Sequence, residues 1–226
     1  MKRIRVALAG NPNVGKSVIF NALTGGRQHV GNWPGKTIEK KEGICYHRGY
    51  ELYIVDLPGI YSLTTFSPEE LIARDYILNE KPDVVVNIVD ASNLRRNLYL
   101  TIQLMELGAR LIIALNKSDL AESLGYEIDE KRLEKNLGVP VVPTVATRKI
   151  GLQELCDKII EVVERGAPPS SITYPEIVEA EIERIRKVLE KDPMIRESYN
   201  TRWLAIKLLE GDEEAERRIL AKLEGG

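Results

Sequence analysis

The sequence predicts an α/β protein, in which a mostly parallel sheet carries helices on both faces and a small all-helical domain follows. Short apolar runs typical of buried strands alternate with helically spaced apolar segments as far as about residue 165. Polar motifs follow several of these strands at their carboxyl ends, where doubly wound folds bind ligands. Beyond a stretch rich in proline and serine, only helical patterns occur. We therefore expect domains at 1–166 and 172–226, joined by a linker at 167–171.

The first strand is expected at 4–9, because a short uninterrupted apolar run is typical of a strand buried on both faces. A glycine-rich loop and a helix at 18–24 follow, and the glycine pair after this helix can end it. Residues 27–37 contain too many glycines and prolines for a helix or a long strand, so we expect a mobile loop there. Trp33 in this loop has two interpretations, a solvent-facing aromatic that packs locally or a contact for a partner.

Two short strands around Arg48-Gly49 predict a hairpin. Ser67 can cap a helix that reaches about Asn79, because Pro68 suits the first helical position. The remaining strands are expected at 84–89, 111–115 and 140–145, and the remaining helices of the first domain at 94–107, 129–137 and 152–164. Beyond the linker we expect helices at 176–191, 201–209 and 212–223.

Composition excludes several classes of function. A formal net charge of -2 and a pI near 5.9 give no basic field for nucleic acid, so no nucleic-acid partner is expected. Cys45 and Cys156 are far apart in sequence and are expected as free thiols, and His29 and His47 lack partners at metal-ligand spacing. No apolar stretch reaches the roughly 18 residues of a membrane span, so we expect neither a signal peptide nor a transmembrane helix.

The loop after the first expected strand predicts phosphate binding. It reads Gly10-Asn11-Pro12-Asn13-Val14-Gly15-Lys16-Ser17, and the next helix opens at Val18. The run matches G-x-x-x-x-G-K-[ST], whose glycines let backbone N–H groups converge on a polyphosphate. The lysine supplies positive charge for the β- and γ-phosphates, and the serine hydroxyl can hold Mg²⁺. The alternative is an ordinary strand-to-helix turn that matches by accident.

A second motif, Asp56-Leu57-Pro58-Gly59, follows the second strand of the expected hairpin. It resembles the D-x-x-G element of GTPases. Asp56 suits a carboxylate that anchors a metal, and the Gly59 N–H suits a contact to the γ-phosphate.

The base is expected to be guanine. Asn116-Lys117-Ser118-Asp119 follows another strand, and the carboxylate of Asp119 can accept from both the ring N–H and the exocyclic amine of guanine. Lys117 would lay its stem along the base, and Asn116 would tie this loop to the phosphate loop. Thr144-Val145-Ala146 would offer the Ala146 N–H to the guanine carbonyl. This last site departs from the usual Ser-Ala pattern and has an alternative interpretation as an ordinary strand end.

Together these residues resemble a known family. Residues 3–165 resemble a translation-factor-type small GTPase with a Ras-like P-loop GTPase fold, and more narrowly the FeoB family of prokaryotic ferrous iron transporters. The stretches that carry the narrower match are GNPNVGKSVIFN (10–21), GNWPGKTIEKKEG (31–43) and DLPGIYSL (56–63), and residues 200–212 resemble the family's helical domain.

The resemblance implies roles for further residues. It makes residues 26–37, which end in Gly35-Lys36-Thr37, the first switch and residues 59–67 the second, and gives Mg²⁺ three ligands, Ser17, Thr37 and Asp56. The residues implied in catalysis are Asn13, Lys16, Thr37 and Gly59. Ile60 stands where Ras-like GTPases carry a water-orienting glutamine, so slow GTP hydrolysis is expected. Asn13 would help to bind K⁺ beside the phosphates, or would simply form hydrogen bonds within the loop.

The resemblance therefore implies a GTP-hydrolysing switch at the cytoplasmic face of the cell membrane, serving an Fe²⁺ permease portion that is absent from this chain. A ribosome- or RNA-associated assembly GTPase and a non-hydrolysing, nucleotide-sensing adaptor are the alternatives. The sequence leaves open whether the chain forms a homo-oligomer.

Overall fold

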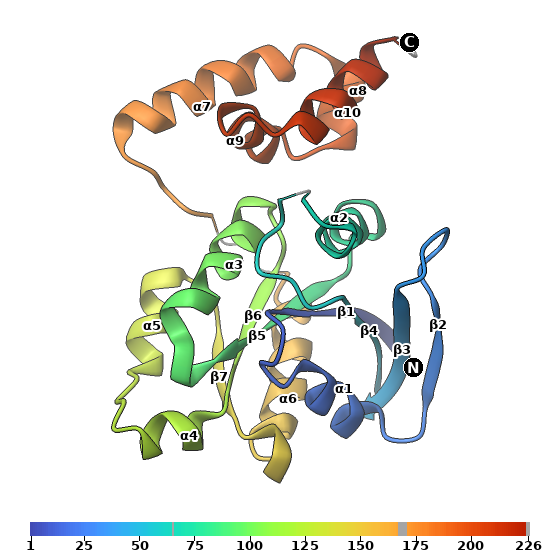
Figure 1. Cartoon of the computed structure of the whole chain (residues 1–226), viewed down its shortest axis with the longest axis vertical. Coiled ribbons are helices and arrows are strands. Elements are labelled where there is room, and N and C mark those ends of the chain that lie inside the picture. The colour runs from blue at the N-terminus through green and yellow to red at the C-terminus, as the bar shows by residue number, and fades with distance from the viewer. Residues whose placement is uncertain (65, 167–170, 225–226) are drawn as a thin grey trace.

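The computed structural model describes residues 1–64, 66–166 and 171–224. Within them, one seven-stranded sheet has the strand order β2-β3-β4-β1-β5-β6-β7 (Figure 1). The strands are β1 (Lys2–Gly10), β2 (Gln28–Asn32), β3 (Glu39–His47), β4 (Tyr50–Asp56), β5 (Val84–Asp90), β6 (Leu111–Asn116) and β7 (Val141–Thr144). The run from β4 to β7 is parallel, whereas β2 and β3 form an antiparallel edge. The carboxyl ends of the parallel strands thus lie along one edge, as predicted.

Apolar side chains on both faces of the sheet form two clusters, because β1 and β5 alternate their residues between them. One cluster holds the helices α1 (Lys16–Thr24) and α6 (Leu152–Glu164). The other holds α2 (Pro68–Asp75), α3 (Leu94–Glu106) and part of α5 (Glu130–Leu137). Ser67 caps α2 by accepting from Glu70 N, and a π-helical turn (Tyr76–Glu80) continues that helix to the predicted end. The α/β prediction is confirmed.

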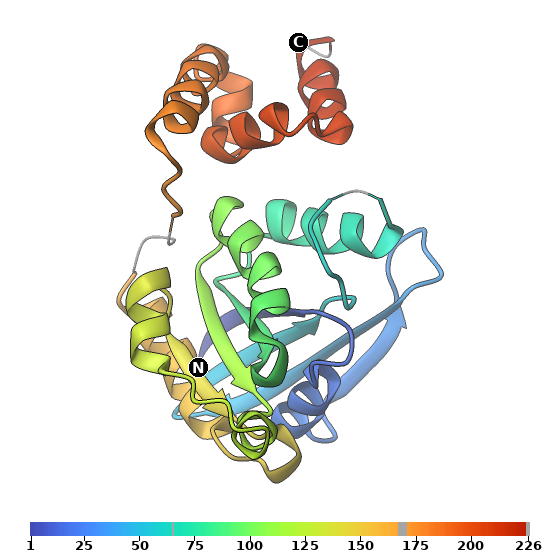
Figure 2. The ribbon, with the colours of Figure 1, turned by 60° about the vertical axis from the view of Figure 1, so that its left-hand side comes forward.

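The carboxyl-terminal helices form a layer beyond α2 and α3 (Figures 1 and 2). They are α7 (Glu176–Leu189), α8 (Pro193–Ser198), α9 (Thr201–Leu209) and α10 (Glu213–Glu224). Trp203 is fully buried and belongs to the same apolar cluster as Leu100 and Leu104 of α3. Arg74 of α2 is also fully buried, with its guanidinium over the Trp203 ring and 2.6 Å from Asp212 Oδ2. The helical part therefore shares a core with the α/β part.

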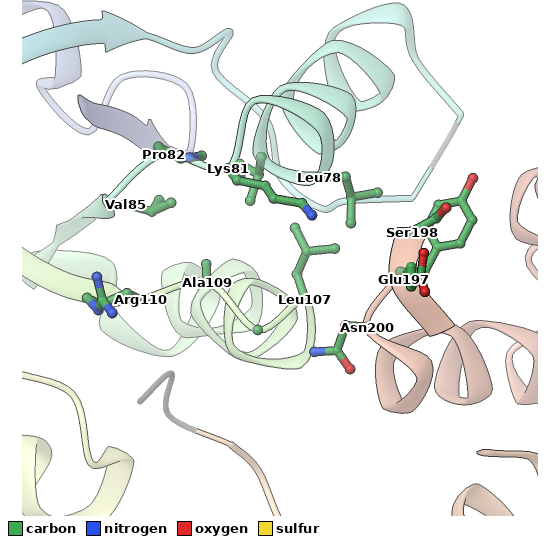
Figure 3. Close-up of a pocket in the computed structure, with 13 residues that line it drawn as sticks. Leu78, Lys81, Pro82, Val85, Leu107, Ala109, Arg110, Glu197, Ser198 and Asn200 are labelled. Atoms are coloured by element: carbon green, nitrogen blue, oxygen red, sulfur yellow. The ribbon is translucent and has the colours of Figure 1, made fainter. Parts of the chain in front are cut away.

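A cavity of about 350 Å³ lies where the two parts meet (Figure 3). Its lining comes from the end of the π-helical turn, the end of α3 and the end of α8, including Leu78, Lys81, Leu107, Glu197 and Asn200. Gly108 ends α3 with φ +79°, and a Cβ built there would lie 2.5 Å from Asn200 Nδ2. Glycine is therefore needed for the close approach of the two parts. The residues that line this cavity include none of the predicted nucleotide-binding motifs.

The structure corrects the predicted mobile loop at 27–37. Residues Gln28–Asn32 form β2, which pairs with β3 through the backbone. The solvent-facing interpretation of Trp33 is also wrong, because its side chain is buried. Its ring packs edge-to-face on Tyr76, 5.6 Å between centroids, and Lys40 Nζ lies 5.1 Å from its centre. These contacts fix Trp33 against the end of α2.

Two short helices escaped prediction, α4 (Ser118–Ser123) and α8. Asp192 caps α8 by accepting from the backbone N–H groups of Met194 and Ile195. Most of the predicted linker, 167–170, lies outside the described residues. Among the helices that are described, none has both the length and the apolar character needed to cross a membrane.

Candidate nucleotide-binding site

The loop between β1 and α1 wraps tightly at the carboxyl end of β1. Gly15 caps α1 with φ +91°, and Asn13 also adopts a left-handed backbone, with φ +66°. A Cβ on Gly10 would lie 2.7 Å from the carbonyl oxygen of Ile88, so the loop packs directly on β5. A cavity of about 560 Å³ opens beside the loop. It is lined by Asn11, Pro12, Asn13, Gly15, Lys16, Ser17, Val18 and Gly59.

Three of the predicted phosphate and metal ligands converge here. The ammonium of Lys16 forms an ion pair with the carboxylate of Asp56, and both side chains are largely buried. The Ser17 hydroxyl lies 3.5 Å from the other carboxylate oxygen of Asp56. A cation, a hydroxyl and a carboxylate thus meet at the amino terminus of α1, where the helix dipole also favours an anion.

The segment after β4 lies against the phosphate loop. Leu57 N donates to Leu8 O at 3.0 Å, and Ile60 N donates to Gly10 O at 3.1 Å. These bonds hold the intervening Pro58-Gly59 beside the cavity, and a Cβ on Gly59 would come within 3.3 Å of Pro12 Cα. The Ile60 side chain is buried and apolar. It therefore cannot orient a water molecule at the cavity.

Asn116 joins three segments through one amide. Its Nδ2 donates to Val14 O at 2.8 Å, and its Oδ1 accepts from Ala146 N at 3.0 Å and from Thr144 Oγ1 at 3.2 Å. Asn116 therefore ties its own loop to the phosphate loop, as expected. The Ala146 N–H, expected to face the guanine carbonyl, donates to Asn116 here, so a base would have to share it. Val145, between Thr144 and Ala146, is buried.

Lys117 bridges the phosphate loop and the end of β5. Its Nζ lies 2.9 Å from Asn13 O and 2.6 Å from Asp90 Oδ2. Burial would raise the pKa of Asp90, but hydrogen bonds from Lys117 and Ser92 outweigh it and lower that pKa. Asp90 was missed in the sequence. Its position directly after the apolar run of β5, matching that of Asp56 after β4, was a usable signal.

Asp119 remains accessible at the end of this site. Its Oδ1 accepts from Leu120 N at 2.9 Å, and Arg148 Nη2 lies 3.7 Å from Oδ2. The carboxylate side chain is about one-third exposed, so both oxygens can still meet a base. Arg148 was also missed, and no motif in the sequence singles it out.

The predicted first switch is not brought to the other site residues. Gly35, Lys36 and Thr37 are exposed, on the loop between β2 and β3 that projects from the edge of the sheet (Figure 1). Thr37 is not among the described residues that line the phosphate cavity. In the predicted second switch, Leu63 N donates to Gln103 Oε1 at 2.7 Å, which fastens this segment to α3. The structure therefore does not bring Thr37 together with Ser17 and Asp56.

Residues 4–159 match the family model for the amino-terminal part of ferrous iron transport protein B (FeoB). This chain belongs to the FeoB family. A second model, for the FeoB cytosolic helical domain, matches residues 174–224. The family assignment therefore covers both the α/β part and the helical part, and it favours the iron-transport interpretation over an RNA-associated GTPase.

Individual FeoB proteins extend this likeness. The chain is 57% identical to the Fe²⁺ transporter FeoB of Methanocaldococcus jannaschii over 219 residues, 97% of this chain and 32% of that protein. It is 44% identical to FeoB of Escherichia coli K12, over 94% of this chain and 27% of that protein. The chain thus spans about a third or less of the length of these relatives.

Solved structures of FeoB share the fold. The cytosolic domain of T. maritima FeoB in GDP form I superposes with a TM-score of 0.90 at 41% identity, covering 96% of this chain and 84% of that one. The same domain in its GMPPNP form gives a TM-score of 0.89 at 42% identity, over 95% of this chain and 84% of that one.

Proposed function

We propose that this FeoB-family chain binds and hydrolyses GTP as the cytosolic switch of a membrane Fe²⁺ transporter, at the cytoplasmic face of the membrane. The observation that carries the proposal is the junction at Asn116, which holds the phosphate loop and the base-recognition loop together. The T. maritima relative, solved in GDP and GMPPNP forms, supports the choice of nucleotide. The permease portion would lie outside this chain.

The phosphates would enter the cavity beside the β1–α1 loop. Backbone N–H groups between Asn13 and Ser17 and the amino terminus of α1 favour negative charge there. Lys16 would transfer its ammonium from Asp56 to the β- and γ-phosphates, and this movement frees the carboxylate. The Gly59 N–H, held near Pro12, would approach the γ-phosphate as charge develops in the transition state.

The residues present fit a magnesium ion. Ser17 Oγ and Asp56 Oδ2 converge at 3.5 Å, and a hydroxyl with a carboxylate is the oxygen donor set that Mg²⁺ prefers. When bound, Mg²⁺ would neutralise charge between the β- and γ-phosphates. Thr37 would add its oxygen once the first switch closes.

Base recognition would rest on Asp119, whose two oxygens match two donors of guanine. The Lys117 ammonium is held by Asn13 O and Asp90, and its aliphatic stem would lie along the base. The Ala146 N–H would contact the guanine carbonyl while sharing its hydrogen with Asn116. Thr144 and Val145 would support this amide from the end of β7.

Water activation would be slow, because Ile60 has no polar group and is buried. Asn13 borders the phosphate cavity, and we propose that its side chain helps to hold a K⁺ ion beside the phosphates. A fixed cation at that place would stabilise transition-state charge.

Fluorescent GTP and GDP analogues titrated into the purified chain test nucleotide binding, with ATP as the competing control. Phosphate release, measured on the same protein, separates a GTPase from a non-hydrolysing adaptor. Lys16→Ala should abolish both signals. Binding of ATP as tight as that of GTP, or phosphate release equal to that of a blank, would overturn the proposal.

A further inference from the structure

The two cysteines of the chain, far apart in sequence, meet in the fold. Cys45 lies on β3 and Cys156 on α6, and Cys45 packs against the apolar cluster to which Cys156 belongs, close enough for the two thiols to interact. A polar contact beside the cysteines joins the same two elements, because His47 Nε2 at the end of β3 lies 2.6 Å from Asp157 Oδ1 on α6. Arg48 Nη2 reaches the other oxygen of Asp157 at 2.8 Å. The approach of β3 to α6 is thus held by several contacts.

The two thiols differ in access. Cys45 is partly exposed, whereas Cys156 is 3% exposed and packs among apolar side chains. A reagent from solvent would meet Cys45 first, and Cys156 would lie behind it in the apolar cluster. This arrangement is the one required of an attacking thiol with a resolving thiol.

We propose that Cys45 and Cys156 form a hydroperoxide-responsive thiol pair, in which Cys45 reacts with peroxide and Cys156 resolves the product into an intramolecular disulfide. The reaction needs no residue of the nucleotide site and stands independently of the proposed GTPase activity.

The charges around the pair favour this assignment of roles. The interaction with Cys156 lowers the pKa of Cys45, against the effect of burial, and nearby His47 and Arg27 add to it. The same interaction, burial and the charges of Cys45 and Asp157 raise the pKa of Cys156. The opposite directions favour Cys45 as the attacking thiolate and Cys156 as the thiol that keeps its proton.

The chemistry balances with hydrogen peroxide as the oxidant. The Cys45 thiolate attacks one peroxide oxygen, the O–O bond breaks, and Cys45 sulfenic acid and hydroxide form. The Cys156 sulfur then attacks the sulfenic sulfur, the S–O bond breaks, and water leaves with the thiol proton. A thiolate and a thiol have together lost two electrons, and one peroxide has become one hydroxide and one water.

The disulfide would join β3, which follows the first switch, to α6, which leads to the helical part. β3 begins two residues after Thr37 of the first switch, and α6 is the last helix before the helical part. Oxidation would therefore fix the strand that follows the first switch to the helix that precedes residues 167–171. We expect the chain to resist unfolding more strongly when oxidised.

Thiol counting by mass spectrometry tests the proposal, because the sequence contains only these two cysteines. The reduced chain is treated with hydrogen peroxide, denatured and alkylated with N-ethylmaleimide. We expect the intact mass to show two adducts before treatment and none after it, with a loss of two hydrogens. The urea midpoint should rise on oxidation and return after dithiothreitol.

Two variants separate the roles. Cys156→Ser should leave a Cys45 sulfenic acid that dimedone traps, whereas Cys45→Ser should leave Cys156 largely unoxidised. Two adducts on the wild-type chain after peroxide, or a disulfide formed only between two molecules on a non-reducing gel, would overturn the proposal. The wild-type mass measurement does so even where a variant fails to fold.

Discussion

The ammonium of Lys16 and the carboxylate of Asp56 form an ion pair between the phosphate loop and the end of β4. Only 11% and 6% of the two side chains are exposed, so each charge depends on the other for compensation. When a phosphate pairs with Lys16, Asp56 loses its partner and needs another cation for charge compensation. Phosphate binding and metal binding are therefore coupled through this one contact.

Ser17→Ala should reduce Mg²⁺-dependent GTP hydrolysis by about tenfold or more, or about 1.4 kcal/mol of barrier, and should weaken GDP binding less. The substitution removes one oxygen ligand beside Asp56 and leaves Lys16 in place. Phosphate release across a magnesium titration measures the first effect and a fluorescent GDP analogue the second. Ser118→Ala, whose hydroxyl bonds only to Leu115 O in the described contacts, is the matched control. Parental turnover in Ser17→Ala would show that the loop is misassigned.

Asp119→Asn should weaken GTP binding and shift preference to xanthosine triphosphate, by about a hundredfold or more in relative affinity. An amide can donate to the 2-carbonyl of xanthine, but it cannot accept from both guanine donors. Competition between the two nucleotides measures the shift. Arg148→Ala is the control, because Arg148 is 3.7 Å from Asp119 yet should not read the base. An unchanged guanine preference in Asp119→Asn would refute the role of that carboxylate.

KCl should accelerate GTP hydrolysis over NaCl at equal ionic strength by about tenfold or more. Asn13→Ala should abolish the difference, because the cation would lose a ligand beside the phosphates. Steady-state phosphate release in the two salts is the measurement. Equal rates for the wild-type chain would leave Asn13 with a role in loop structure alone.

Asp212→Ala should cost about 3–5 kcal/mol in the free energy of unfolding, because it leaves the fully buried Arg74 uncompensated. Asp212→Asn should cost less, since an amide can still accept from Ala215 N at the start of α10. Urea denaturation provides the values. Glu161→Ala, at an exposed surface pair, should cost less than about 1 kcal/mol. Equal losses for Asp212→Ala and Glu161→Ala would contradict the shared core.

Acid should weaken the helical part through Glu179. Hydrogen bonds from Arg202 and from Tyr174 N lower the pKa of Glu179 to about 2, from an ordinary value of 4.5. A carboxyl with a lowered pKa stabilises the fold above its unfolded value and loses that contribution as the pH falls from 4.5 towards 2. The contribution is about 1 kcal/mol or less, because both partners are partly exposed. Glu179→Gln should flatten the fall of the urea midpoint over this range, and an unchanged slope would exclude the pair as its source.

Apolar periodicity was sufficient to predict the α/β fold, and motif spacing was sufficient to predict the glycine-rich loop after β1, because both features depend on residues close together in sequence. β2 could not be predicted this way. It is a mostly exposed edge strand that pairs with β3 through its backbone, so its side chains carry no alternating apolar pattern. Trp33 likewise owes its burial to Tyr76, which is distant in sequence.

The site was predictable where a motif lies at the end of a strand and not elsewhere. Asn116 meets Val14 as expected because strand ends converge at one edge. Arg148 reaches Asp119 only through the turn after β7, and no spacing rule connects them. The position of Thr37 depends on the conformation of an exposed loop, which sequence motifs do not specify.

The hydrogen bonds of Asn116 restrict which substitutions the site can tolerate. A side chain at this place must donate to Val14 O and accept from Ala146 N, which an aspartate or a leucine of similar size cannot do. A Cβ at position 15 would lie 2.4 Å from Asn116 Nδ2, so any residue other than glycine there would displace the amide. Substitutions at Gly15 and Asn116 are therefore coupled. A side chain at position 15 would displace the Asn116 amide, and without that amide the two loops lose their shared hydrogen bonds.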